Sequence, residues 1–184
     1  MSEPLTDEEL AAVTVGGLKR LDGPVELADP DPSWPDQYDV EAAYLRAILG
    51  DRVLRLEHVG STSVPGLPAK PILDVQISVL NVDDHGSFAP ALERAGYLVR
   101  VREPGHVLYR SPERDVHVHL CAVGSEWERR HLVFRDWLRT HPDDRDLYAD
   151  VKRRLLRDEW ESMIDYSFAK TGVITTIMQR AEAS

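Results

Sequence analysis

A short segment between residues 58 and 76 holds the side chains best suited to chemistry. A glycine–serine turn, Gly60 and Ser61, opens a loop of small residues. The loop ends near Lys70, and Asp74 follows on a predicted strand. Glycine lets the backbone approach a ligand closely, and the N–H groups and hydroxyls of such a turn can hold phosphate oxygens. A carboxylate beside those phosphates can hold a divalent cation, so the segment predicts a phosphate- and metal-binding loop.

The glycine spacing of this loop matches neither a Walker A loop nor a dinucleotide-binding fingerprint. The pattern therefore leaves a second interpretation open. In that interpretation the Gly-Ser-Thr-Ser run is only a tight turn, and Asp74 is a strand-face carboxylate paired with an arginine.

Two histidines on a later strand form a second candidate group. Residues 115–121 alternate polar and apolar side chains, which places His117 and His119 on one face of that strand. With Asp74 they could hold one metal ion, and imidazole ligands favour manganese, zinc or another transition ion over magnesium. The alternative is a polar sheet face without a metal. Cys121 shares this face as a soft ligand, although a single cysteine is more often a core residue.

Basic side chains in the C-terminal third could neutralise phosphate charge. Arg135 and Arg139 stand four residues apart on a predicted helix, which suits an anion, although both could instead pair with nearby aspartates. Lys152 begins a basic run that is typical of a solvated helix face. Tyr166 and Lys170 are also four residues apart, and could either reach the site or simply pack.

His58 directly precedes the loop and could contact a substrate as a catalytic residue. The alternative is a partly buried histidine that is hydrogen-bonded to the backbone. A nucleophilic triad finds no support, because Ser61 or Ser63 beside His58 lacks a third group to orient the imidazole.

The hydrophobic pattern places these residues in an α/β domain with a mixed sheet. Alternation predicts strands over 52–59, 71–80, 97–102, 106–110 and 115–121. Caps and helical spacing predict helices over 33–49, 88–95 and 126–139, from residue 142, and through Trp160, Ile164 and Phe168, with a continuation through Met178 left open. We therefore expect a sheet-rich core to about residue 122 and a helical part over 125–182 packed against it.

Residues 1–23 are expected to form an extension that precedes the domain, which is expected over 24–184. Thr6 and Glu9 fit a capping box for a short helix in this extension. A short strand is expected at 25–27. The oligomeric state stays open.

The composition narrows the classes of function. The chain has 184 residues, of which 42% are hydrophobic and 29% charged, as in ordinary globular proteins. Its net charge of −10 argues against nucleic acid as a partner, because phosphate neutralisation needs a basic face. One cysteine excludes an internal disulfide and a cysteine-rich zinc site. An acidic N-terminus and no apolar run of roughly 18 residues argue against a signal peptide and a membrane span, so we expect a cytoplasmic protein.

The motifs resemble those of the GrpB family (UPF0157), which is also found fused to some dephospho-CoA kinases. The likeness begins with the run from Glu57 to Leu67 and continues through residues 69–71 and Asp74. It extends to Gly96-Tyr97, His117-Val118-His119 and residues 134–139, and to Tyr148, Lys152, Tyr166 and Lys170.

This resemblance implies a nucleotidyltransferase-like fold. In that superfamily a glycine–serine turn precedes two carboxylates at alternate strand positions, and a third lies on a neighbouring strand; they hold two metal ions around a nucleoside triphosphate. Residues 60–61 match the turn, and Asp74 matches the first carboxylate. The second position is the neutral Gln76, and the third falls at His117 or His119.

We therefore expect a transferase or ligase that uses ATP or another nucleoside triphosphate on a small molecule. The reaction would be nucleotidyl transfer or activation of a carboxylate through an adenylate. Asp74, His117 and His119 would hold the divalent metal, either magnesium or manganese or another transition ion. The nucleotide-binding residues would be Gly60, Ser61, Thr62, Ser63, Lys70, Arg139 and Lys152, and the catalytic residues would be Asp74, Lys70, Arg135 and His58.

Gln76 in place of a second carboxylate keeps another hypothesis open. In that hypothesis the chain is a non-catalytic module that binds a nucleotide or an anionic metabolite. A third hypothesis is a hydrolase with a histidine–aspartate transition-metal centre.

Overall fold

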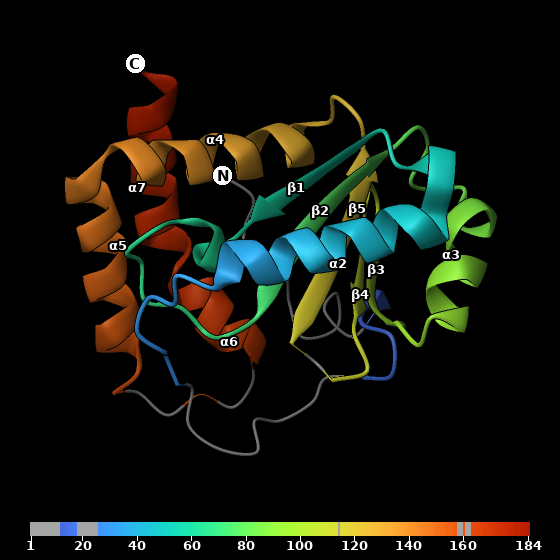
Figure 1. Ribbon diagram of the computed structural model, residues 1–184. Coiled ribbons are helices and arrows are strands. Elements are labelled where there is room, and N and C mark those ends of the chain that lie inside the picture. The colour runs from blue at the N-terminus through green and yellow to red at the C-terminus, as the bar shows by residue number, and fades with distance from the viewer. Residues whose placement is uncertain (1–11, 18–25, 114, 158–159, 161–162) are drawn as a thin grey trace.

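A five-stranded mixed sheet forms the centre of the molecule (Figure 1). The computed structural model describes residues 12–17, 26–113, 115–157, 160 and 163–184. The strands are β1 (Arg55–Val59), β2 (Leu73–Val79), β3 (Leu98–Glu103), β4 (His106–Arg110) and β5 (Val116–Ala122), in the order β1-β2-β5-β4-β3. β2 and β5 run parallel, and the other neighbouring pairs are antiparallel.

One face of the sheet is apolar and buried. Along β2 the alternate residues Leu73, Val75, Ile77 and Val79 point to this face, and β5 adds Val116, Val118 and Leu120. Helices α2 (Trp34–Leu49) and α3 (His85–Arg94) cover it, and Figure 1 shows α2 crossing in front of the strands. Period-two alternation in two central strands therefore makes the main core.

Four helices follow the sheet in the C-terminal part of the chain. They are α4 (Glu126–Thr140), α5 (Pro142–Leu155), α6 (Met163–Ala169) and α7 (Thr171–Glu182), and α4 packs against β1 and β5. A second apolar cluster joins Val64 and Leu67, from the loop between β1 and β2, to Leu138, Tyr148 and Ile177 of these helices. The loop is therefore seated on the C-terminal helices rather than left in solvent.

The predicted mixed α/β class with appended helices is confirmed, and most elements begin within a few residues of the expected positions. The first strand starts at Arg55 rather than at residue 52, because Gly50–Arg52 form a 3-10 turn, η1. The short strand expected at 25–27 is also wrong where it is described, at residues 26–27. Only an isolated bridge between Ala28 and Ala69 lies next to it, and Val25 falls outside the described residues.

The expected helix through Trp160, Ile164 and Phe168 is wrong at its start. Trp160 lies before α6, where its indole Nε1 donates a hydrogen bond to the Leu155 carbonyl at 2.7 Å. The side chain therefore closes the end of α5 instead of opening a new helix. Lys170 then separates α6 from α7, so the continuation through Met178 is a separate helix.

Part of the N-terminal extension extends the far edge of the sheet. Val15 donates its backbone N–H to the Arg100 carbonyl at 2.8 Å, and Thr14 forms a bridge with Val101 of β3. The capping box expected at Thr6 and Glu9 lies outside the described residues. None of the helices in the described ranges is both long and apolar enough to cross a bilayer.

Candidate metal and phosphate site

Asp74, His117 and His119 converge on the face of the sheet opposite the main core. The parallel pairing sets Asp74 beside His117 and Gln76 beside His119. The Asp74 Oδ1 atom lies 3.3 Å from His117 Nδ1 and 3.3 Å from His119 Nε2. The aspartate side chain is 28% exposed and each imidazole 17%, so the group is open to a ligand. The structure therefore brings together the three residues predicted to hold a metal.

The spacing of these atoms fits a shared ion. Two donors that bind one metal at roughly 2.0–2.2 Å lie about 3 to 3.5 Å from each other. The two distances from Asp74 to the histidines fall in this range, and the three ligand atoms all lie within 4.8 Å of one another. Two imidazole nitrogens and one carboxylate are a donor set that suits zinc, manganese or iron. Burial alone would raise the pKa of the Asp74 carboxyl, but the two imidazoles hold it well below its usual range. The carboxylate is therefore ionised and ready to bind a cation.

The glycine–serine turn rests directly against this carboxylate. Gly60 has φ +69°, a left-handed conformation that other residues rarely adopt, and a Cβ added there would lie 2.8 Å from the Cβ of Asp74 and clash with its Oδ2. Glycine is therefore required at this position for two reasons, the backbone conformation and the close approach to Asp74.

The loop hydroxyls predicted to hold phosphate are mostly used inside the loop itself. Ser61–Ser63 form a 3-10 turn, η2, in which Thr62 and Ser63 are buried. The Ser63 Oγ donates to the Gly60 carbonyl at 2.6 Å, and the Thr62 Oγ1 donates to the Ile72 carbonyl at 3.2 Å. The prediction for these two hydroxyls is therefore corrected: they stabilise the turn. Ser61 is half-buried.

Two lysines face one tyrosine close to Asp74. The Lys70 and Lys170 ammonium groups lie 4.5 and 4.6 Å from the centre of the Tyr166 ring. Burial, followed by the charges of Lys170 and Arg110, lowers the pKa of Lys70 to about 8, and the Asp74 charge opposes this shift. Burial also lowers the pKa of Lys170, again against Asp74. These mutual effects show that a local positive cluster adjoins the carboxylate.

Lys152 supports the loop from helix α5. Its Nζ donates to the Pro68 carbonyl and to the Ser61 Oγ, the latter at 3.2 Å, and the side chain is only 2% exposed. Burial, with the charges of Lys170 and Arg153, lowers its pKa to about 7. The predicted nucleotide-binding role of Lys152 therefore becomes a positioning role for the loop.

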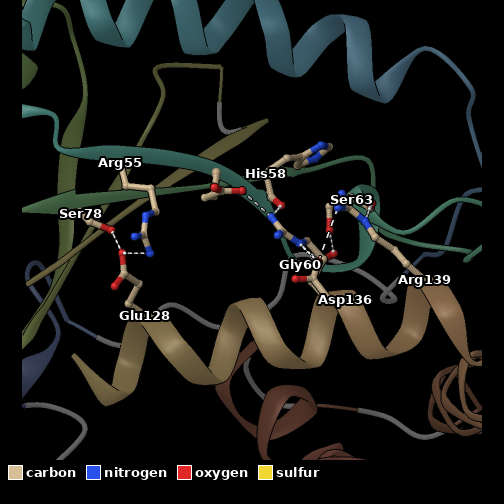
Figure 2. Close-up of polar contacts among 10 residues, drawn as sticks. Arg55, His58, Gly60, Ser63, Ser78, Glu128, Asp136 and Arg139 are labelled. Carbon is tan, nitrogen blue, oxygen red and sulfur yellow. Dashed lines mark hydrogen bonds and ion pairs between the residues drawn. The ribbon is translucent and has the colours of Figure 1, made fainter. Parts of the chain in front are cut away.

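Helix α4 is tied to β1 by Arg135 and to the same loop by Arg139, whose contact with Ser63 is drawn in Figure 2. The Arg135 guanidinium donates to the Glu57 carboxylate at 2.7 Å, to the His58 carbonyl at 3.0 Å and to Asp136 at 2.8 Å. Arg139 donates twice to the Ser63 carbonyl, at 2.8 and 3.0 Å. These donors tie the helix to β1 and to the loop rather than facing Asp74, and the catalytic role of Arg135 and the nucleotide-binding role of Arg139 stay predictions.

His58 lies on the core face of the sheet, whereas the metal candidates lie on the opposite face. It pairs with the core residue Val75, its ring stacks on Tyr38 at 4.6 Å, and its Nε2 lies 3.0 Å from the Thr62 Oγ1. Figure 2 shows this ring pointing away from helix α4. Burial lowers its pKa to about 4, although Asp74 opposes this. These contacts favour the alternative of a neutral, hydrogen-bonded histidine, and the catalytic role of His58 stays a prediction.

Arg135, Arg139 and His58 share a separate hollow at the edge of the sheet. It measures about 280 Å³ and is also lined by Tyr38 and Glu57. These three residues, predicted to act with Asp74, therefore gather on the outer side of the loop.

Gln76 and Cys121 do not add ligands to the group. Gln76 is fully buried, and neither its amide oxygen nor its nitrogen has a hydrogen-bond partner among the described residues. Cys121 is also fully buried, its Sγ lies 4.0 Å from the Ser78 Oγ, and burial raises its pKa to about 11. The metal candidates in the described part of the chain therefore remain the single carboxylate and two imidazoles.

The sequence analysis did not predict one cationic residue near the site, Arg110, and left the role of another, Lys170, open. Arg110 pairs with His117 across β4 and β5, so alternation along β4 places it on the same face. Lys170 reaches the cluster from the junction of α6 and α7, and its four-residue spacing from Tyr166 was the available signal.

Comparison with known proteins identifies the family. The family model described as GrpB protein matches residues 24–180. The chain belongs to the GrpB family. A UPF0157 protein of Halalkalibacterium halodurans is 45% identical over 100% of this chain and 95% of its own length, and one of Streptomyces coelicolor is 45% identical over 92% and 90%. The resemblance drawn from the motifs is thereby confirmed.

A solved structure and a longer relative extend the comparison. The crystal structure of GrpB from Enterococcus faecalis has a TM-score of 0.75 and 32% identity, covering 85% of this chain and 96% of that one. A dephospho-CoA kinase of Mycolicibacterium paratuberculosis is 33% identical over 71% of this chain but only 39% of its own length. The GrpB-like region is thus one part of that larger kinase.

The contact between Gly60 and Asp74 yields a prediction about stability. We expect Gly60→Ala to lower the free energy of unfolding by about 2–4 kcal/mol, because left-handed strain and a steric clash add together. Urea unfolding followed by circular dichroism measures this. Gly105→Ala is the matched control, since Gly105 also has a positive φ but open space around it. It should cost about 1 kcal/mol, and equal costs for the two variants would contradict the close approach to Asp74.

Proposed function

We propose that this GrpB-family chain is a metal-dependent enzyme that transfers a nucleotidyl group from a nucleoside triphosphate to a small molecule. The observation that supports it most is the convergence of Asp74, His117 and His119 next to Lys70 and Lys170. An acceptor oxygen attacks the α-phosphorus, the bond to the bridging oxygen breaks, and pyrophosphate leaves. With a carboxylate as the acceptor the product is an acyl adenylate, from which a second nucleophile displaces AMP.

Asp74, His117 and His119 are the residues that would hold the metal. A divalent ion bound there supplies Lewis-acid stabilisation of negative charge on phosphate oxygens. The partly exposed side chains of Asp74 and the two imidazoles leave room for a ligand on the solvent side. Gly60 contributes by letting the backbone turn pass close to the carboxylate.

Lys70 and Lys170 would hold the phosphates. Both ammonium groups lie over the Tyr166 ring and interact electrostatically with Asp74, and a lysine ammonium binds phosphate oxygens through charge-assisted hydrogen bonds. The Tyr166 hydroxyl is buried without a hydrogen-bond partner among the described residues, so it is a further donor for the substrate. The basic cluster thus offsets the acidic character of the whole chain where the ligand would bind.

The relatives give coarser support for this proposal. A protein named dephospho-CoA kinase contains a region similar to this chain, which favours a nucleotide-related role. Gln76 favours a site with one metal ion, because a neutral amide is a weak ligand for a second hard cation.

The metal role of Asp74 can be tested directly. We expect Asp74→Asn to reduce the affinity for Mn²⁺ and Zn²⁺ at least about 100-fold, because it removes the charged ligand at the centre of the group. Isothermal calorimetry on the purified chain measures this. Asp83→Asn makes the same change on an exposed residue beyond the other end of β2, and should leave both affinities unchanged. Equal metal binding by Asp74→Asn and the native chain would remove Asp74 from the mechanism.

The role of the lysines is tested through nucleotide affinity. We expect Lys170→Met to weaken ATP binding about 10- to 100-fold in the presence of Mn²⁺, because one charge-assisted hydrogen bond is lost. Metal affinity should not weaken, which separates this role from that of Asp74. Lys170→Arg keeps the charge and should retain most of the ATP affinity. Undiminished ATP binding by Lys170→Met would place the phosphates elsewhere.

The buried Gln76 favours one alternative, a non-catalytic module that binds a nucleotide or an anionic metabolite. Incubation with labelled ATP, Mn²⁺ and a pool of metabolites separates the two functions. Metal-dependent release of AMP or pyrophosphate, lost in Asp74→Asn, is the result that we expect of the enzyme. ATP binding without release of either product would favour the binding module.

A further inference from the structure

A chain of hydrogen-bonding groups reaches the metal candidates from the hairpin between β3 and β4. The Glu103 Oε1 lies 2.7 Å from His106 Nδ1, and His106 Nε2 lies 3.0 Å from His119 Nδ1. His119 Nε2 then lies 3.3 Å from the Asp74 Oδ1. Glu103 and His106 end and begin the two strands of this hairpin, so the turn brings both to the same face as His119.

The carboxylate at one end of this hydrogen-bonded series determines which ring nitrogens carry protons. The Glu103 carboxylate only accepts hydrogen bonds, so His106 Nδ1 must carry the proton between them. A proton on Nδ1 of the His106 ring leaves a lone pair on Nε2, which lies 3.0 Å from His119 Nδ1. That lone pair accepts the Nδ1–H of His119. When a cation lies beside Asp74, this order leaves the Nε2 lone pair of His119 available to bind it.

A lone pair that faces a carboxylate oxygen at 3.3 Å is repelled unless a cation lies between the two atoms. Without a cation, the stable arrangement would be an N–H of His119 directed at Asp74. The Glu103–His106 pair favours the proton on the opposite nitrogen, because the His106 Nε2 lies 3.0 Å from His119 Nδ1 and accepts its N–H. The hairpin therefore prepares His119 as a metal ligand.

Helix α4 packs against the rings of His106 and His119 and limits their movement. The Trp127 indole stacks on His106 at 4.4 Å with an interplanar angle of 14°, and lies 5.4 Å from the His119 ring. His131, one turn later, also stacks on Trp127, with ring centroids 3.6 Å apart. This packing limits rotation of His106, so its hydrogen bonds keep their direction.

We infer that Glu103 and His106 are positioning residues that fix the ligand tautomer of His119 and so make this a transition-metal site rather than a magnesium site. The inference rests on the metal role in the proposed function. Carboxylate or backbone oxygen supports are common around a metal-binding histidine, and their loss typically costs 10- to 100-fold in affinity. Magnesium binds oxygen ligands and retains water, so it gains little from an oriented imidazole.

The experiment measures metal affinity of the full chain by calorimetry, with Mn²⁺, Zn²⁺ and Mg²⁺ as probes, and records the absorption spectrum of bound Co²⁺. His106→Phe keeps the ring that stacks on Trp127 but removes the acceptor for His119. We expect it to weaken Zn²⁺ and Mn²⁺ binding about 10- to 100-fold and to shift the Co²⁺ spectrum. Glu103→Gln should have a smaller effect in the same direction, because its amide oxygen can still accept from His106.

The controls separate this inference from the function it rests on. Glu93→Gln changes an exposed carboxylate on α3 and should leave metal affinity unchanged. If the native chain binds Zn²⁺ and both hairpin variants bind it equally well, the inference is overturned while the metal role of Asp74 stands. Tighter binding of Mg²⁺ than of Zn²⁺ or Mn²⁺ by the native chain also overturns it. If the native chain binds no divalent ion, both the proposed function and the inference are overturned. If His106→Phe fails to fold, the inference is tested by Glu103→Gln and by the metal preference of the native chain.

Discussion

The parallel pairing of β2 with β5 is the constraint on which the rest of the structure depends. It places Asp74 beside His117 and, two residues on, Gln76 beside His119. Because strand side chains alternate, the same pairing sends the apolar residues of both strands to the opposite face, under α2 and α3. One register therefore fixes the main core and the candidate site together. A shift of one residue would exchange the two faces and expose the core.

The loop between β1 and β2 depends on the C-terminal helices as much as on its own sequence. Arg139 from α4 binds the Ser63 carbonyl, and Lys152 from α5 binds the Pro68 carbonyl. Buried carbonyls need such donors, so two cations are used to hold the loop against Asp74. The cations that face the site itself are those packed on Tyr166. Structural and ligand-binding charges are thus divided between the two sides of one loop.

Sequence patterns predicted what depends on local periodicity. Alternation was sufficient to place His117 and His119 on one face, and the resemblance to the GrpB family implied that Asp74 lies on a neighbouring strand. Patterns failed where a partner distant in sequence decides. His58 appeared to belong with the loop, but antiparallel pairing with β2 turns its ring toward Tyr38. The same limit applies to Arg135, whose partner Glu57 is known only once α4 is placed against β1.

The net negative charge of the whole chain does not by itself argue against an anionic ligand at Asp74. Charges separated by more than about 8–10 Å are largely screened at physiological salt, so the excess of acidic residues elsewhere has little effect on a ligand at Asp74. Within the site the neutral Gln76 matters more. One carboxylate and two neutral imidazoles leave a divalent ion with a surplus positive charge, to which Lys70 and Lys170 add. A second carboxylate at position 76 would cancel that surplus. The amide at position 76 would therefore favour a polyphosphate at the proposed site while making a second metal ion less stable.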